Sequence, residues 1–412
     1  MNRSKNIIYL FVLFAVFSCD TSSSVEPRYS DYFLKYHGSA GDQIAAEFKQ
    51  TLDGGFIIVG TSKSIEGGEE ILLIKTDQLG NEEWNSTFVK GIEYKNEGIA
   101  VEILSDGSGY LVAGNSTAVI NDADKDVLLI KVDNDGNELD REVLGDLNHV
   151  EEVSDILILN NGDIMLAGSS SNTTKFFKNS NPSDDTYDFY FPKVDINLDP
   201  ITSWTGYWGF EGEDKAVSIS QNNIGDFVIF GTSDRSETSD PSLDNNNFFV
   251  RTLLASEIFG DGGVTTGTTD NQLASNMSMT SVGGQLLVGT SESSNGSNIF
   301  ISRINSDNKK ASSFELLKVE ATTGKAIVEA IGGGYLILGS ITRNANSDVY
   351  LLKTNNSGAV IWEQIFGGSN DDLPGDLIQL EDGSIVFTCT VMLDNQQKIG
   401  LIKTNEKGNL YN

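Results

Sequence analysis

The fold is decided by residues 54–84, which read GGFIIVGT (54–61), then ILLIKTD (71–77), then GNEEW (80–84). An apolar strand that ends in Gly and a small polar residue is followed by a loop and by a second apolar strand that ends in Lys and Thr. This pattern occurs seven times along the chain. Its copies are anchored on the Gly or its equivalent at Gly60, Gly114, Gly168, Gly231, Gly289, Gly339 and Thr388.

The spacing of the anchors, 49 to 63 residues, predicts an all-β protein with the fold of a β-propeller. A repeat of this kind holds about four short strands and cannot bury both of its faces alone, so it stacks on its neighbours as one blade. In the first copy we expect strands at 44–51, 55–62, 71–76 and 84–88, here called A to D. Gly with Asn or Asp in the A–B and C–D connections supplies the positive φ of tight hairpins.

The two ends of the chain predict how the ring closes. The outer strand of the sixth copy reads WEQIFGG (362–368), and the chain after its first segment reads YFLKYHG (32–38), with aromatic residues at the same two places. The last copy has strands A, B and C, and its outer strand is missing. We therefore expect seven four-stranded blades, with the last blade closed by the N-terminal strand, which removes exposed sheet edges. In blade 4, the Gly- and Thr-rich stretch 255–271 predicts a short outer strand at 257–260.

The first 19 residues have the pattern of an export signal. A basic start precedes an apolar run at 7–17, and Ser18 precedes Cys19. This resembles the lipobox of bacterial lipoproteins, in which the Cys is lipidated and becomes the first residue after cleavage; an ordinary signal peptide or a short membrane anchor is the alternative. The sequence thus divides into three expected parts: a lipoprotein signal peptide (1–18), the lipidated Cys with a flexible polar tether (19–30), and one seven-bladed propeller (31–412).

Charge and cysteine content limit the partners and the cross-links. The chain carries 59 acidic against 28 basic residues, a net charge of −31. Phosphate contacts need Lys and Arg, so we expect no nucleic-acid partner, and membrane contact through the lipid anchor only. The other cysteine, Cys389, lies in an apolar strand, so we expect no internal disulfide in the mature chain.

Acidic residues or amides recur at the start of strand A. They stand 17 or 18 residues before the anchor in six of the seven copies. Carboxylates at one mouth of a ring are candidate ligands for a hard cation, and Ca²⁺ is the one cofactor that the sequence suggests. The alternative is structural, because such side chains commonly cap turns by accepting bonds from backbone N–H groups. The candidate metal ligands are Asp42, Glu97, Glu151, Asp214 and Asp371.

The repeat quoted above resembles the repeats of exported bacterial β-propeller lipoproteins. The resemblance covers nearly all of the chain after the signal, and implies a protein anchored by lipid to the outer membrane or cell surface of a Gram-negative bacterium. Such proteins serve as interaction modules, whereas other propellers are hydrolases or lyases. With only two histidines, the sequence favours a monomeric binding or scaffolding module for a protein or glycan partner of the cell envelope. The alternative is a glycan-active hydrolase or lyase with a metal-assisted acidic site.

The connections between strands B and C vary most in length. They lie on the same face as the D–A connections, because the tight hairpins occupy the other face. We expect this loop face to bind the partner through its two longest loops, 170–186 and 233–246, which mix apolar and charged residues. The alternative is that both loops are insertions without a role. The candidate binding residues are Lys175, Phe176, Phe177, Lys178, Arg235 and Asp244.

Overall fold

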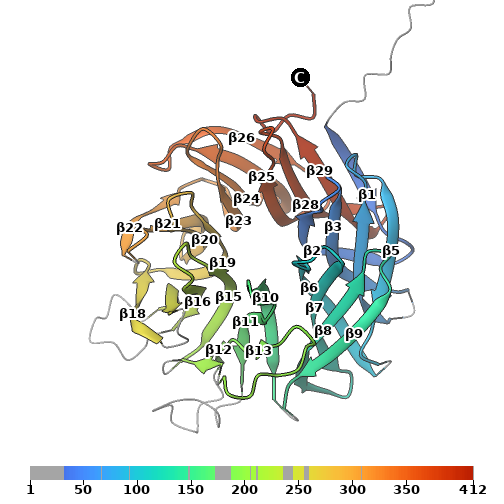
Figure 1. Ribbon diagram of the computed structural model, residues 1–412. Coiled ribbons are helices and arrows are strands. Elements are labelled where there is room, and N and C mark those ends of the chain that lie inside the picture. The colour runs from blue at the N-terminus through green and yellow to red at the C-terminus, as the bar shows by residue number, and fades with distance from the viewer. Residues whose placement is uncertain are drawn as a thin grey trace, which may run out of the picture. The chain divides into compact units, whose positions relative to one another are not determined.

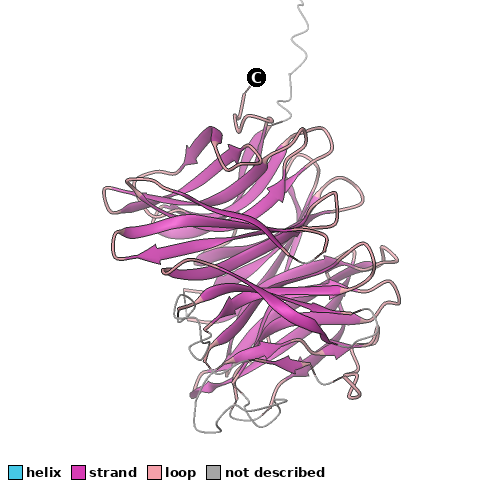
Figure 2. Cartoon of the chain, turned by 90° about the vertical axis from the view of Figure 1, so that its left-hand side faces the viewer, coloured by secondary structure: helices cyan, strands magenta, loops and turns pink. Residues whose placement is uncertain are grey.

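The computed structural model describes residues 32–411 apart from positions 66, 92, 147–148, 172–186, 205, 210–211, 235–244, 255–258 and 308. The described residues belong to one compact unit, Tyr32–Asn412. Its regular elements are all strands (Figure 2). Within these residues, nothing forms a helix that is long and apolar enough to cross a membrane.

Seven antiparallel sheets stand around a central axis as blades, which confirms the predicted seven-bladed propeller (Figure 1). Blade 1 comprises β2 (Asp42–Gln50), β3 (Phe56–Lys63), β4 (Glu69–Thr76) and β5 (Glu82–Phe88); blade 2, β6 (Tyr94–Ile103), β7 (Gly109–Ala118), β8 (Asn121–Asp133) and β9 (Glu138–Leu144). Blade 3 comprises β10 (Glu151–Ile158), β11 (Ile164–Ser170), β12 (Asp188–Tyr190), β13 (Lys193–Val194) and β14 (Tyr207–Trp208); blade 4, β15 (Asp214–Gln221), β16 (Phe227–Ser233), β17 (Asn247–Leu253) and β18 (Phe259–Thr266).

The remaining blades complete the ring. Blade 5 comprises β19 (Asn271–Met279), β20 (Gln285–Ser293), β21 (Gly296–Ile304) and β22 (Lys310–Leu316); blade 6, β23 (Ala321–Glu329), β24 (Tyr335–Arg343), β25 (Asn346–Thr354) and β26 (Val360–Phe366). Blade 7 comprises β27 (Leu373–Gln379), β28 (Ile385–Leu393), β29 (Gln396–Thr404) and, as its outer strand, β1 (Phe33–His37). Because neighbouring strands are antiparallel, the A–B and C–D turns share one face of the ring, here called the hairpin face, and the other connections share the loop face.

Ring closure follows the prediction made from the two ends of the chain. Strand β1 pairs with β29 over five residues, from Phe33 opposite Lys403 to His37 opposite Ile399. The N-terminal strand thereby covers the edge that β29 would otherwise expose, as an edge strand must be covered to prevent further pairing. Figure 1 shows the first and last parts of the described chain side by side in this blade.

The outer strand of blade 4 corrects one prediction. The strand was expected at 257–260, but β18 spans Phe259–Thr266 and pairs with β17. The Gly-rich composition that indicates a loop has a packing cause here, because a Cβ at Gly263 would lie 2.1 Å from the Phe249 ring. A glycine within a strand commonly marks such a close approach.

The repeated Gly is followed by a small polar residue that bonds to the next blade at five of the seven junctions, among the described residues. At Gly60 a Cβ would lie 2.2 Å from the carbonyl oxygen of Ile44 in strand A, so only glycine fits there. The following Thr61 hydroxyl accepts a bond of 3.2 Å from the Gly98 amide of blade 2. The same bond from the next blade's strand A recurs at Asn115 (from Val153, 2.8 Å), Thr232 (from Ala274, 2.8 Å), Thr290 (from Gly324, 3.3 Å) and Thr390 (from Ala45, 3.0 Å). In blade 7 the register places Cys389, and not the predicted anchor Thr388, where the other blades have glycine.

Each innermost strand carries a β-bulge at the same height, beside the position of the amide that donates this bond. The extra residue of a bulge is unpaired and turns out of the ladder, here toward the axis. The residues at these bulges line a central channel with a volume of about 160 Å³. They are Ala46, Ile99, Ser154, Val217, Ser275, Lys325 and Gly375 with Asp376.

Candidate functional site

On the hairpin face, an aromatic side chain from strand D packs at four of the junctions between neighbouring blades, among the described residues. Three of these rings occupy one register position, opposite a lysine of strand C: Phe33 opposite Lys403, Trp84 opposite Lys75, and Trp362 opposite Lys353. Each ring covers the glycine of the C–D turn in the next blade, where a Cβ would lie 2.5 Å (Gly80), 2.7 Å (Gly136) or 3.1 Å (Gly408) from it. We call Phe33, Trp84 and Trp362 the junction aromatics.

The junction between blades 2 and 3 lacks both halves of this arrangement. The residue opposite Lys131 of strand C is Asp140, in the place of a junction aromatic. The C–D turn of blade 3 has Leu198 in the place of the glycine. The Leu198 amide donates to the Asp195 carbonyl at 3.0 Å, and the Gly136 amide donates to the Asp133 carbonyl in the same way in blade 2. Leu198 keeps a left-handed φ of 66°, which is costly for a residue with a side chain.

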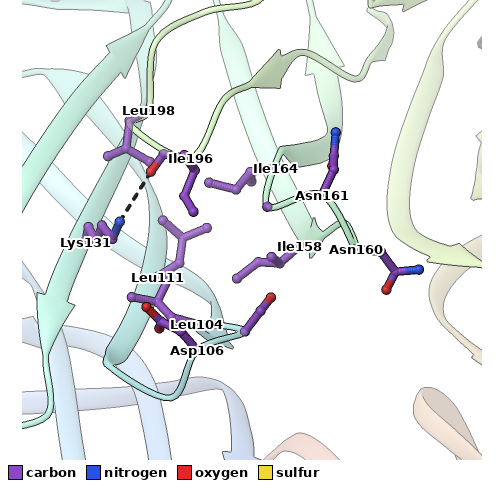
Figure 3. Close-up of a pocket in the computed structure, with 12 residues that line it drawn as sticks. Leu104, Asp106, Leu111, Lys131, Ile158, Asn160, Asn161, Ile164, Ile196 and Leu198 are labelled. Carbon is purple, nitrogen blue, oxygen red and sulfur yellow. Dashed lines mark hydrogen bonds between the residues drawn. The ribbon is translucent and has the colours of Figure 1, made fainter.

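An apolar pocket of about 230 Å³ opens on the hairpin face at this junction (Figure 3). Six aliphatic side chains form its walls: Leu104, Leu111, Ile158, Ile164, Ile196 and Leu198. Leu111, Ile164 and Leu198 are buried in the core below, whereas Ile196 at the mouth is 53% exposed. Lys131 is fixed at one side by a bond of 3.3 Å from its Nζ to the Ile196 carbonyl. We call this site the 2/3 pocket.

Acidic side chains lie beside the 2/3 pocket. Asp140 and Glu142 project from β9, and Asp199 follows Leu198 in the turn of blade 3. Burial raises the pKa of the half-buried Glu142, and the like charges of Asp199 and Asp140 raise it further. Within the described part of the chain, no ion pair joins these three carboxylates to a cation, and Lys131, opposite Asp140, is the one cation among the residues that line the pocket.

A second cleft, of about 390 Å³, lies at the junction between blades 1 and 2, and charged residues lie in its walls beside aromatic and aliphatic ones. Lys75 is buried there, with its Nζ 2.8 Å from Asp53 Oδ2 and 2.9 Å from Glu83 Oε2. Burial alone would raise the pKa of Asp53, but hydrogen bonds from Lys75, Thr51 and a backbone amide lower it to about 2. The charges of this cleft are thus largely satisfied by one another, in contrast to those beside the 2/3 pocket.

The five predicted metal ligands stand one to a blade in five blades, and most of them serve as backbone caps. Asp42 accepts from the Gln397 amide at 2.8 Å, and Asp371 accepts from the Ser347 amide at 2.8 Å. Glu151 accepts from the Asp146 amide at 3.2 Å, while Glu97 lies opposite Asn115 and Asp214 lies opposite Ser233. Among the described residues, no three His, Cys, Asp or Glu side chains gather as a metal site would require.

Carboxylates that the sequence did not single out lie in the central channel and beside Asp214. Asp155 accepts from the Ile219 amide at 2.8 Å and from the Ser218 hydroxyl at 2.9 Å, and burial followed by the like charge of Glu47 raises its pKa. Burial raises the pKa of Asp188 to about 7, with a further contribution from Asp214. These groups are held within strands and connect neighbouring blades.

The other predicted site residues fall outside the described residues. This applies to the lipidation site Cys19 and to the six loop-face candidates Lys175, Phe176, Phe177, Lys178, Arg235 and Asp244. The loop-face prediction therefore stays a prediction. The two junction clefts open on the hairpin face, opposite to the loop face on which the sequence predicts binding. A signal for the 2/3 pocket was present in the sequence, because GNELD (136–140) replaces the Trp of GNEEW (80–84) by Asp.

Comparison with known proteins supports the fold class. No protein-family model matches the sequence, and no curated protein matches it. The crystal structure of puromycin hydrolase superposes with a TM-score of 0.51 at 11% identity, over 86% of this chain and 50% of that chain. This chain therefore spans about half the length of that enzyme. The β-propeller domain of the Trilobed protease from Pyrococcus furiosus gives a TM-score of 0.49 at 8% identity, over 90% of this chain and 97% of that chain.

A third solved structure is the α-L-arabinofuranosidase of Fusarium graminearum, with a TM-score of 0.46 at 10% identity, over 74% of this chain and 92% of that chain. At such identities a likeness shows a shared fold and carries no activity from one protein to the other. The fold defines this chain as a seven-bladed β-propeller closed by its N-terminal strand.

Proposed function

We propose that this protein is an exported, lipid-anchored binding module, and that it holds a protein partner of the cell envelope in the 2/3 pocket. The observation that carries the proposal is the pocket itself: an open cavity of about 230 Å³ with six aliphatic walls, at a junction where other blades place an aromatic ring. A concave apolar site with a few polar groups at its mouth is the usual form of a binding site.

The chemistry of the walls favours a protein over a glycan. Sugars commonly bind against aromatic faces, and none of the residues that line this pocket is aromatic, whereas six of them are aliphatic. An apolar side chain of a partner would instead bury itself there, as the anchor residues of protein interfaces do in fully desolvated pockets.

The anchoring half of the proposal rests on the first residues of the sequence. The basic start, the apolar run and Cys19 have the pattern of a lipoprotein signal. Several acyl chains at the N-terminus would hold the propeller at a membrane, since each buried CH₂ contributes about 0.8 kcal/mol. Replacing Cys19 with Ser is expected to release the protein or to leave its signal uncleaved; a processed form that still sediments with membranes would contradict this half.

The binding half can be tested in intact cells by photo-cross-linking. A photoreactive residue at Asn161, on the rim of the 2/3 pocket, is expected to cross-link a discrete partner, and Ile196→Asp is expected to abolish that product. The matched control is Ile331→Asp in the A–B turn of blade 6, because Ile331 is 54% exposed and Ile196 is 53% exposed on the same face. A cross-link that survives Ile196→Asp, or that Ile331→Asp removes equally, would place the binding site elsewhere.

A further inference from the structure

We infer that the 2/3 pocket receives an aromatic side chain flanked by basic residues, presented by a segment of the partner protein. This inference rests on the proposed function and names the chemistry of the occupant. Its two parts, the ring and the basic flank, come from different observations and can fail separately.

The ring is inferred from the neighbouring junctions. Phe33, Trp84 and Trp362 each insert between two blades from the register position that Asp140 holds in blade 2. The propeller thus packs an aromatic side chain at this position of a junction three times within its own chain, although a cleft remains beside Trp84. At the 2/3 junction Asp140 takes this position, and none of the described residues places a ring in the open pocket, which leaves room there for a ring of the partner.

The size and the walls of the pocket fit such a ring. An apolar cavity of about 150 Å³ is large enough to take benzene. The 2/3 pocket has about 230 Å³ and is lined on opposite sides by aliphatic groups of blades 2 and 3, so a six-membered or fused ring would contact both walls (Figure 3). Leu198 stands where the other junctions have glycine, and its side chain closes one side of the pocket. Its left-handed φ of 66° therefore helps to shape the cavity.

The basic flank is inferred from the acidic residues around the pocket. Asp106 lines it, Asp140 stands opposite the pocket residue Lys131, and Asp199 follows Leu198 in the turn, so like charges repel one another there. Lys or Arg beside the ring would relieve this repulsion and form ion pairs at the rim of the interface. Charge complementarity of this kind sets the preference among partners and weakens as salt is added.

The occupant is a protein segment and not a second copy of this chain. The chain has a net charge of −31, so two copies would bring like charges together at an acidic rim. A basic partner segment would instead bring opposite charges together at this rim. Its aromatic residue supplies the buried anchor, and its cations supply the specificity.

The test uses the full chain and four acetylated, amidated tripeptides: Lys-Trp-Lys, Lys-Leu-Lys, Lys-Ala-Lys and Glu-Trp-Glu. Binding is measured by calorimetry at low and at high salt. We expect Lys-Trp-Lys to bind best, to lose about tenfold or more in affinity when Trp becomes Ala, and to weaken with salt. Ile196→Asp and Asp140→Lys are each expected to weaken it similarly, while the controls Ile331→Asp and Glu381→Lys, on turns of blades 6 and 7, leave it unchanged.

The outcomes separate this inference from the proposed function. If Lys-Leu-Lys binds as well as Lys-Trp-Lys, the pocket is a binding site but the aromatic preference is wrong. If Glu-Trp-Glu binds as well, the basic flank is wrong. If none of the four peptides binds at millimolar concentration, both the inference and the proposed role of the 2/3 pocket are overturned.

Discussion

Replacing Glu151 with Gln tests how the ring holds a buried carboxyl group. Glu151 is fully buried at the start of strand A in blade 3, where it accepts bonds from the Asp146 amide at 3.2 Å and the Ser170 hydroxyl at 3.1 Å. Burial raises its pKa to about 7, although these bonds act in the opposite direction. Three other blades place an amide at the same position opposite a serine: Gln43 opposite Ser62, Asn96 opposite Ser116, and Gln272 opposite Ser291.

The sign and size of the effect follow from the two protonation equilibria. The usual pKa of 4.5 applies in the unfolded chain, and the raised value of about 7 applies in the folded protein. Between these values the folded protein binds a proton that the unfolded chain has released. The contribution to stability is therefore fully present below about pH 4.5 and is lost as the pH rises through about 7. A shift of this size corresponds to roughly 3 kcal/mol.

The assay is chemical denaturation of both proteins between pH 5 and about pH 8. Since Gln does not titrate, the free energy of unfolding of Glu151→Gln is expected to fall less steeply with pH than that of the wild type. The difference between the two should grow by roughly 3 kcal/mol over this range. Glu381→Gln, on the exposed A–B turn of blade 7, is the control and should follow the wild type. Parallel profiles for wild type and Glu151→Gln would refute the reasoning.

Three further predictions concern the ring. Thr232→Val leaves the Ala274 amide without its acceptor between blades 4 and 5, which should lower the free energy of unfolding by about 1–3 kcal/mol. Thr232→Ser keeps the acceptor and should stay near wild type in the same denaturation experiment. Deleting residues 32–38 removes β1 and exposes the edge of β29, so a lower melting temperature and aggregation by light scattering are expected; an unchanged melt would show that the ring does not need this closure. Millimolar calcium, compared with a chelator, should leave the melting temperature unchanged, because Asp42 and Asp371 already accept hydrogen bonds from backbone amides. A rise in the melting temperature that Asp42→Asn abolishes would contradict this.

The sequence predicts the ring well because its signals are local and repeated. The hairpin turns, the apolar strands and the matching ends at 32–38 and 362–368 each depend on a few neighbouring residues, and all of them agree on a propeller. Strand β18 was misplaced for a tertiary reason, since Gly263 makes room for the Phe249 ring and is not a loop signal.

The 2/3 pocket was missed for a different reason. The change from Trp84 to Asp140 is visible between the first two repeats, but a missing ring has a meaning only when the ring's place between two blades is known. Leu198 gave no signal either, because a left-handed φ at a leucine cannot be read from composition. The acidic residues at the start of strand A are a different case, because the sequence offered capping of turns as an alternative to metal binding. Capping accounts for the hydrogen bonds that Asp42, Glu151 and Asp371 accept from backbone amides.

The central claim is that a partner's aromatic ring enters the 2/3 pocket, and methyl NMR of the full chain tests it most directly. The δ1 methyl groups of Ile158, Ile164 and Ile196 line the pocket, whereas that of Ile331 lies on a turn of blade 6. On titration with the Lys-Trp-Lys peptide, we predict ring-current shifts at the three pocket methyls, with Ile331 unchanged. Shifts that avoid Ile158, Ile164 and Ile196, or that appear instead at another junction, would contradict the claim.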